Sequence, residues 1–263
     1  MRYGVLADVH GNLPALEAVL GALERERVDA YLCAGDLVGW GPFPDECVEL
    51  VAALEPVCVA GNHDLIALGR LSDERCGRQA RDTLRWTRAT LGAATRAYLD
   101  GLPLTATAPG RVVLAHGALD DAQRYTRGPG QARAELARLA DEYPQARVLI
   151  LGHTHRAAAW RAAGGGSAPR GERRWVVDLG TGGPSLLNPG AVGQSRERLV
   201  RARFMVLDLE RDQAEFHAVD YDVGRTRDAL QRLGLPEESV HLRPSPLRRA
   251  VAWAREAAWA VRG

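Results

Sequence analysis

Two histidines separated by one threonine lie near the middle of the chain, in the sequence Gly152-His153-Thr154-His155. They directly follow the apolar run at residues 148–151, which predicts a short buried strand. In an α/β sheet, ligands bind beside the carboxyl ends of the strands, so the two imidazoles lie where a ligand would bind. A lone histidine is usually an ordinary surface or core residue. Two at this spacing, with further His and Asp residues after upstream strands, predict a metal site.

The other candidate ligands also follow predicted strands. Oxygen and imidazole donors without thiolate suit Mn, Fe, Zn or Ni better than they suit Ca or Mg. Two histidines, His217 and His241, lie outside these motifs and are interpreted as ordinary strand or loop residues. The strands at residues 2–7, 30–34, 57–60 and 111–115 precede the remaining motifs. The predicted ligands are Asp8, His10, Asp36, Asn62, His116, His153 and His155.

The motifs resemble, in their order along the chain, those of the calcineurin-like metallophosphoesterase superfamily. They read Asp-x-His, Gly-Asp-x-x-Gly, Gly-Asn-His-Asp, His-Gly and Gly-His-Thr-His, and the resemblance runs from Asp8 to at least Val192. Gly-x-Gly-Pro at 39–42 and Asn-Pro-Gly-x-Val-Gly-Gln at 188–194 look like a bacterial branch of stand-alone phosphoesterases. The resemblance implies a four-layer α-β-β-α sandwich of two mixed sheets, with a small helical insertion at residues 65–102.

The resemblance also implies a role for each residue of the site. His63 is not a ligand in the family pattern; it contacts the substrate and is the candidate general acid for the leaving oxygen. Two divalent ions ~3.5–4 Å apart polarise a phosphoryl oxygen and generate a hydroxide nucleophile at neutral pH. Their charge outweighs two carboxylates and a hydroxide, so the site would attract phosphate. The implied sets are Asp8, His10 and His155 on one metal, Asn62, His116 and His153 on the other, and Asp36 bridging both.

Two positions depart from the protein Ser/Thr phosphatases of this superfamily. There the second motif continues with an acid that orients the catalytic histidine and an arginine that grips phosphate. Here those positions are Gly39 and Trp40, which counts against a phosphoprotein phosphatase. Asp64 is a candidate to orient His63 instead.

The segments beside the motifs contain the candidate substrate contacts. Arg196, just after the Asn-Pro-Gly turn, is a candidate phosphate contact, with a solvated surface arginine as the alternative. Asn188 in the same turn is a second candidate. Specificity would lie in this turn, in residues 65–102 and in residues 118–127. Their composition selects neither a nucleotide nor a sugar nor a peptide.

These residues suggest three functions. The first is a dinuclear metal-dependent phosphoesterase for small phosphodiesters or phosphomonoesters, nucleotides among them, with two divalent transition-metal ions. Manganese is the expected metal, and Fe, Zn or Ni are alternatives. The second is a phosphoprotein (Ser/Thr) phosphatase. The third is a metal-binding scaffold without turnover, which the complete ligand set and His63 disfavour.

Composition limits the classes of binding partner and the cellular compartment that we expect. The 263 residues carry a net charge of +1, which gives no electrostatic reason to expect a nucleic-acid or membrane partner. No apolar run approaches the ~18 residues that suggest a membrane span, and the N-terminus has no targeting signal. The four cysteines form no CxxC pair, which favours the cytoplasm. The expected partner is a small phosphorylated substrate, and the oligomeric state stays open.

The remaining segments predict a single domain over residues 1–263. Helices are expected at 45–54 and 131–143, and an amphipathic C-terminal helix within 245–263. Residues 156–162 and 175–179 are expected to form a hairpin, with residues 164–167 as its loop. Strands at 204–209 and 214–219 complete a second group of strands.

Overall fold

The computed structural model of the protein describes residues 1–162, 165–180, 182–243 and 245. The predicted C-terminal helix at 245–263 lies outside the described residues, apart from its first position. In the described residues, twelve strands form two six-stranded sheets. Within the described part of the chain, no helix is both long and apolar enough to cross a membrane.

The first sheet combines strands from both ends of the chain. β1, β2 and β3 run parallel to one another, and β11 and β12 add an antiparallel hairpin beside β1. The parallel part brings the carboxyl ends of three strands to one edge. The strand order is β3 (Val57–Cys58), β2 (Ala30–Cys33), β1 (Arg2–Leu6), β11 (Ala202–Asp208), β12 (Gln213–Val219) and β9 (Arg174–Asp178).

The second sheet is also mixed. β5, β6 and β10 are parallel, whereas β4 and β7 pair antiparallel with their neighbours. The apolar runs before His116 and His153 are therefore adjacent strands, so their motifs leave the sheet side by side. The order is β4 (Thr105–Ala108), β5 (Val112–Ala115), β6 (Val148–Ile150), β10 (Ser185–Asn188), β7 (Ala158–Arg161) and β8 (Gly166–Ser167).

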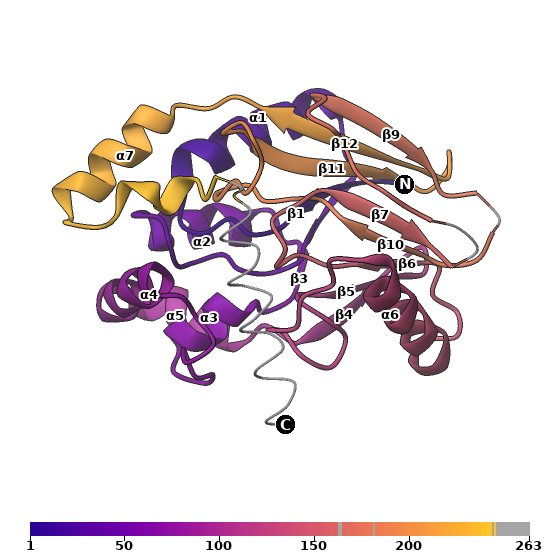
Figure 1. Cartoon of the computed structure of the whole chain (residues 1–263), viewed down its shortest axis with the longest axis horizontal. Helices are drawn as coiled ribbons and strands as arrows, with labels where there is room; N and C mark the ends of the chain where they lie inside the picture. The colour runs from indigo at the N-terminus through magenta and orange to yellow at the C-terminus, as the bar shows by residue number, and fades with distance from the viewer. Residues whose placement is uncertain (163–164, 181, 244, 246–263) are drawn as a thin grey trace.

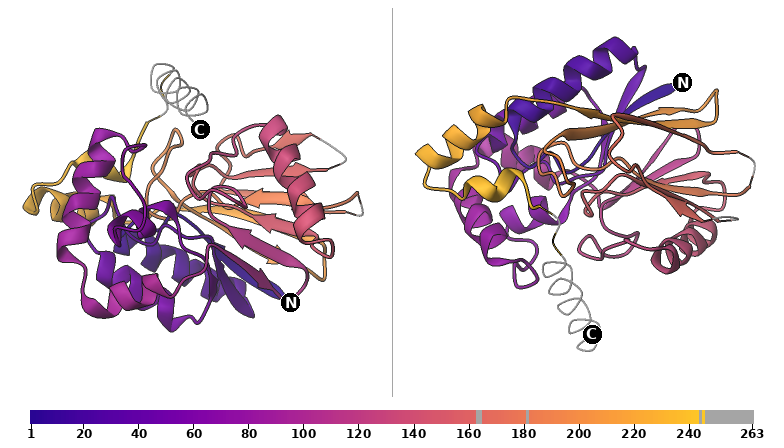
Figure 2. Two further views of the ribbon diagram at one scale, coloured as in Figure 1. Left: turned by 90° about the horizontal axis from the view of Figure 1, so that it is seen from below. Right: turned by 45° about the horizontal axis from the view of Figure 1, so that its top comes forward.

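The two sheets face each other and carry helices on their outer faces (Figures 1 and 2). Successive side chains of a strand point to opposite faces, so Val5 packs between the sheets while Leu6 packs towards α1 (Leu13–Glu26). α2 (Pro44–Ala53) covers the same side, and α6 (Pro129–Glu142) covers the outer face of the second sheet. This is the four-layer sandwich expected from the motifs. The core between the sheets includes Val5, Leu114, Ile150, Leu187, Met205 and Phe216.

Local sequence explains where α1 begins and ends. Asn12 Oδ1 accepts a hydrogen bond from Ala15 N at 3.4 Å, and Pro14 lies in the first turn. Arg27 ends the helix in the left-handed conformation with φ 51°. α7 (Val223–Arg232), which the sequence analysis did not predict, packs on α1, where Thr226 Oγ1 donates to Asn12 Oδ1 at 2.8 Å.

The helical insertion predicted at residues 65–102 is present. It consists of α3 (Asn62–Ala67), α4 (Arg78–Thr90) and α5 (Ala93–Asp100), which lie below α2 in Figure 1. Its packing residues include Leu84 and Leu99, which join the same core cluster as α1 and α2. The insertion is therefore built onto the outer face of the first sheet.

The hairpin predicted between residues 156–162 and 175–179 is wrong. β7 pairs with β10 and with β8, a two-residue strand inside the expected loop, whereas β9 pairs with β12 of the other sheet. Both segments are strands, as their apolar patterns predict. A strand can pair with either sheet, however, and these two strands join different sheets.

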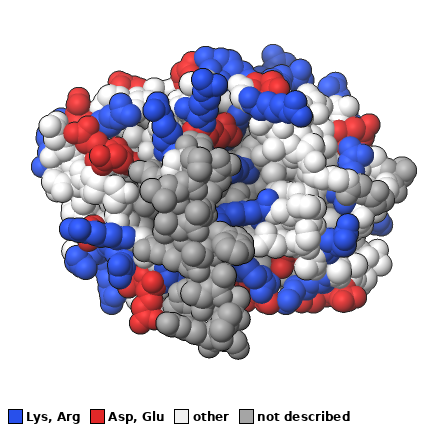
Figure 3. Space-filling view, viewed as in Figure 1, with Lys and Arg blue, Asp and Glu red and all other residues white. Residues whose placement is uncertain are grey.

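Charge of both signs is present on the face of the molecule shown in Figure 3. Basic and acidic side chains are interspersed over the described part of that face. The sequence contains no lysine, so each basic group in that view is an arginine.

Candidate metal centre

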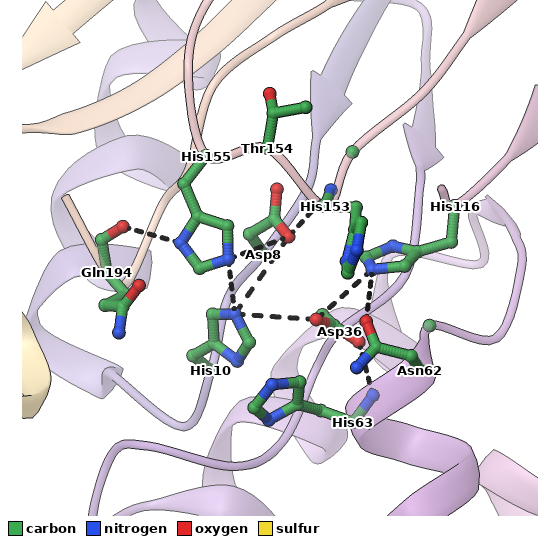
Figure 4. Close-up of polar contacts among 12 residues, drawn as sticks. Asp8, His10, Asp36, Asn62, His63, His116, His153, Thr154, His155 and Gln194 are labelled. Atoms are coloured by element: carbon green, nitrogen blue, oxygen red, sulfur yellow. Dashed lines mark hydrogen bonds and ion pairs between the residues drawn. The ribbon is translucent and has the colours of Figure 1, made fainter. Parts of the chain in front are cut away.

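The loops after β1, β2, β3, β5 and β6 meet at one edge of the two sheets, where the motif side chains come together (Figure 4). Segments far apart in the sequence touch there; for example, His153 N donates to Asp8 Oδ1 at 3.0 Å. All seven predicted ligands are buried, with at most 5% of any one exposed. They are Asp8, His10, Asp36, Asn62, His116, His153 and His155.

Backbone strain is concentrated at the same positions. Five of the seven predicted ligands have φ between 51° and 65°, in the left-handed region that residues other than glycine rarely adopt. Strain of this kind persists where the surrounding structure fixes a conformation for function. The five residues are Asp8, His10, Asp36, His153 and His155.

His10 and His155 face each other through their Nε2 atoms, which are 3.1 Å apart. His10 Nδ1 donates to Val38 O at 3.1 Å, and His155 Nδ1 donates to Gln194 O at 2.8 Å. Burial lowers the pKa of both rings well below the ordinary value, so both are neutral. Each Nε2 therefore presents a lone pair to the other. This arrangement is unfavourable unless a cation lies beside the two nitrogens.

His116 and His153 form the second group with Asn62. His116 Nδ1 contacts Ala34 O at 2.6 Å, which leaves its Nε2 beside Asn62 Oδ1 at 3.2 Å. His153 Nε2 lies 3.2 Å from Gln123 O, so the Nδ1 atom of this ring is the one available to a ligand. Every histidine of the two groups thus has one ring nitrogen held by a backbone carbonyl, the usual way in which a metal-binding imidazole is oriented.

Asp36 lies between the two groups. Its Oδ2 is 3.6 Å from His10 Nε2 and 3.2 Å from His116 Nε2, while its Oδ1 accepts from the backbone N–H of His63 at 2.8 Å. One carboxylate therefore reaches both sets of histidines. The donor atoms within each set lie within 4.8 Å of one another, and the sets are Asp8, His10, Asp36 and His155, and Asp36, His116 and His153.

Electrostatics favour cations at this position. Burial raises the pKa of Asp8 to about 7, and the charge of Asp36 adds to the effect. Burial opposes a charge on His116, but the Asp36 carboxylate prevails and raises the pKa of that imidazole to about 10. The Oδ2 atoms of Asp8 and Asp36 are buried without a hydrogen-bond partner. Since buried charge is costly unless it is paired, this donor set fits divalent metal ions.

His63 lies beside both groups but belongs to neither. Its ring meets that of His10 edge to face, with centroids 4.7 Å apart, and it stacks on Trp40 with centroids 5.9 Å apart. The His63 Nδ1 atom is buried without a hydrogen-bond partner, and a Cβ on Gly39 would lie 2.5 Å from it. Gly39 therefore leaves room for the ring, and Trp40 packs against its face.

Asp64 does not orient His63, so that candidate role is wrong. The Asp64 carboxylate is completely buried and holds together the loops after β2 and β3. Each of its oxygens accepts two backbone hydrogen bonds, so none of its bonds goes to the imidazole. The four donors, at 2.8–3.1 Å, are the N–H groups of Asp36, Leu37, Val38 and Gly61.

Asp64→Asn is expected to lower the free energy of unfolding by about 2–5 kcal/mol, because the new amide group faces two buried N–H donors and leaves them without an acceptor. Urea denaturation of the metal-free protein measures the loss. Asp82→Asn is the matched control, since among the described residues Asp82 pairs only with exposed Arg78 and Arg85 along α4. It should change the free energy by less than about 0.5 kcal/mol. Equal losses in the two variants would contradict this role for Asp64.

The Asn188 side chain forms hydrogen bonds within its own turn, and its predicted substrate-binding role stays a prediction. The residue is buried, with Nδ2 donating to Gly152 O at 2.5 Å and to Thr154 Oγ1 at 3.1 Å. Its Oδ1 accepts from Gly190 N at 3.0 Å. These bonds hold the turn that carries His155, so Asn188 helps to position His155.

Arg196 lies close to the first donor group. Its Nε donates to Gln194 Oε1 at 3.1 Å, and its side chain is partly exposed. After burial, the charge of Arg196 is the next largest cause of the lowered pKa of His155. Gln194, the last residue of the motif at 188–194, accepts hydrogen bonds from both Arg196 and His155. The sequence analysis gave it no role, since only the folded turn shows what its main chain contacts.

Comparison with known proteins identifies the family. The family model of the calcineurin-like phosphoesterases matches residues 1–157 of this chain. The chain belongs to the calcineurin-like phosphoesterase family. The crystal structure of a metallophosphoesterase from Sphaerobacter thermophilus is 34% identical, with a TM-score of 0.78 over 91% of this chain and 96% of the other. A phosphoester hydrolase that uses divalent metal ions is the class of activity that this membership supports.

Two more distant relatives extend over nearly the same length. An uncharacterised protein of Methanocaldococcus jannaschii is 27% identical over 236 residues, which is 89% of this chain and 93% of that protein. The structure of a hypothetical protein from Pyrococcus horikoshii OT3 shares the fold, with 20% identity and a TM-score of 0.72 over 91% of this chain and 96% of that one. The two-sheet fold is therefore shared along almost the whole chain.

Proposed function

We propose that the protein is a dinuclear metal-dependent hydrolase of small phosphodiesters or phosphomonoesters, nucleotides among them. The observation that carries the proposal is the position of Asp36, whose Oδ2 lies between His10 and His116. A carboxylate shared by two groups of imidazole and oxygen donors is what a pair of metal ions requires. Asp8, His10 and His155 would hold one ion, and Asn62, His116 and His153 the other.

Each group at this centre would have a separate role in the reaction. Two divalent ions, for which manganese is our first choice, would polarise a phosphoryl oxygen and activate water. Asp36 fixes the spacing of the two donor groups. The guanidinium of Arg196, held by Gln194, would bind a phosphate oxygen, because a planar guanidinium fits phosphate geometry.

His63 would give a proton to the leaving oxygen. Burial lowers the pKa of His63 to about 4, so the free ring is neutral at pH 7. A phosphate group bound beside the ring favours the protonated form, since a nearby opposite charge stabilises the cation. Binding of substrate and charging of the acid would thus be coupled.

The surroundings of His63 favour small esters over phosphoproteins. Trp40 is buried against the imidazole, with 5% of its surface exposed, and provides no cationic group for a phosphate.

All four cysteines are free, and three of them are buried, which supports a reducing compartment such as the cytoplasm.

The proposal is tested by metal analysis of the purified protein together with Mn²⁺-dependent hydrolysis of bis-p-nitrophenyl phosphate and p-nitrophenyl phosphate. About two ions per chain with diester turnover would support a phosphodiesterase. Turnover of the monoester alone would support a phosphatase. Two bound ions without hydrolysis of either ester, or of any member of a nucleotide panel, would overturn the proposal and leave a metal-binding scaffold.

A further inference from the structure

The helical insertion contacts the loop that follows β5. Arg75, in the connection between α3 and α4, places Nη1 3.1 Å from Asp121 Oδ2 and Nη2 3.2 Å from Gln123 O. In return, Gln123 Nε2 donates to Ser72 O at 3.4 Å. Arg75 Nη1 also donates to Gln123 Oε1 at 3.4 Å, so four hydrogen bonds join two segments that are more than forty residues apart in the sequence.

The same Gln123 carbonyl is the acceptor for His153. His153 Nε2 lies 3.2 Å from Gln123 O, so one oxygen receives both the imidazole N–H and an N–H of Arg75. Tyr125, two residues further on, stacks on the His153 ring with centroids 3.9 Å apart. The loop therefore fixes this imidazole at one ring nitrogen and on one face.

We infer that Arg75 is a positioning residue for His153 and sets the affinity of the metal site to which His153 belongs. This inference rests on the proposed dinuclear site. Arg75 bonds to Asp121 and to Gln123 O at once, so its guanidinium holds the carbonyl at the place where the imidazole N–H must donate. Partners of this kind behind a ligating histidine typically change metal affinity by about 10–100-fold.

The effect should be confined to one of the two ions. His155 is held by Gln194 O and His10 by Val38 O, and neither carbonyl belongs to the loop that Arg75 contacts. Loss of Arg75 should therefore weaken the site of Asn62, His116 and His153 and spare the site of Asp8, His10 and His155. Through Arg75 and Gln123 O, the insertion would therefore support one ligand of the metal centre.

The experiment is calorimetric titration of the metal-free full-length protein with Mn²⁺, which resolves two binding steps if the sites differ. Arg75→Ala should raise the dissociation constant of one step by about 10–100-fold and leave the other within about twofold. Arg75→Lys should recover part of the loss, because an ammonium supplies donors but lacks the planar fork. Arg70→Ala is the matched control in the same insertion, since within the described part of the chain the Arg70 side chain bonds only to exposed Asp100; it should change neither step.

Thermal unfolding of the metal-free variants separates positioning from general destabilisation. Equal affinities in Arg75→Ala and wild type, or equal loss at both steps, would overturn the inference while the proposed function stands. If the wild type bound neither Mn²⁺ nor Fe²⁺, Zn²⁺ or Ni²⁺ in the same titration, the proposed function itself would fail. Should Arg75→Ala not fold, Asp121→Asn removes the other anchor of the guanidinium and must weaken the same single step; an unchanged titration of that variant would equally overturn the inference.

Discussion

Asp36→Asn is expected to remove both metal ions and to lower the rate of ester hydrolysis by at least about 10³-fold, since the two ions supply several kcal/mol of transition-state stabilisation. The structure indicates how the amide would sit. Asp36 Oδ1 accepts the backbone N–H of His63, so the asparagine oxygen would keep that position. Its NH₂ group would then take the place of Oδ2, between His10 and His116, where it cannot bind a cation.

Asp8→Asn is the matched control for this prediction. Asp8 is as deeply buried as Asp36 but belongs to only one of the two donor groups. Metal analysis after dialysis should therefore find about one ion per chain in Asp8→Asn and none in Asp36→Asn. One retained ion in both variants would mean that Asp36 does not bridge. Circular dichroism confirms that both variants are folded.

His63→Ala is expected to keep the full metal content and to lower the rate by ~10²–10⁴-fold, the usual contribution of a general acid. The side chain supplies no donor atom to either group, so its removal takes nothing from the metals. The loss should be larger for an alkyl ester than for a p-nitrophenyl ester, because p-nitrophenolate leaves without needing a proton. Steady-state rates for the two esters, with metal analysis, measure both effects.

His217→Ala is the control for the loss of an imidazole as such. His217 stacks on Phe204 in the first sheet, with centroids 4.8 Å apart, away from the donor groups. Its removal should leave the rate unchanged. If His63→Ala stripped a metal, or if it lost no more rate on the alkyl ester than on the nitrophenyl ester, the assignment of His63 as the acid would fail.

Most strands and helices could be predicted because their patterns are local. The apolar runs before Asp8, Asp36 and His153 are strands in the structure, and Asn12 with Pro14 begins α1 as the sequence indicates. The pairing of β7 and β9 could not be predicted. Each has the alternation of a strand, but which of two sheets a strand joins is settled by contacts between segments distant in sequence.

Every predicted ligand could be located by a local rule, because it lies in a motif that follows an apolar strand. The residues that support the ligands could not be located in this way. A ligand at the end of an apolar strand is visible in the sequence, as His116 after β5 shows. The groups that orient the ligands are main-chain carbonyls, such as those of Gln123 and Gln194, and a main-chain atom has no sequence signature. Asp64 illustrates the opposite case, since a polar side chain interpreted as orienting His63 instead holds two loops together. The Asn188 side chain likewise bonds to its own turn.

The sequence by itself determined the chemistry available to this protein, because donor types and their spacing after strands are written in it. The tertiary structure decided how that chemistry is arranged. It placed Asp36 between two groups of histidines, fixed the tautomer of each imidazole through a carbonyl, and joined the insertion to His153 through Arg75. The physical reason is that hydrogen bonds and charge interactions act over a few ångströms in space, across separations in sequence that no local pattern records.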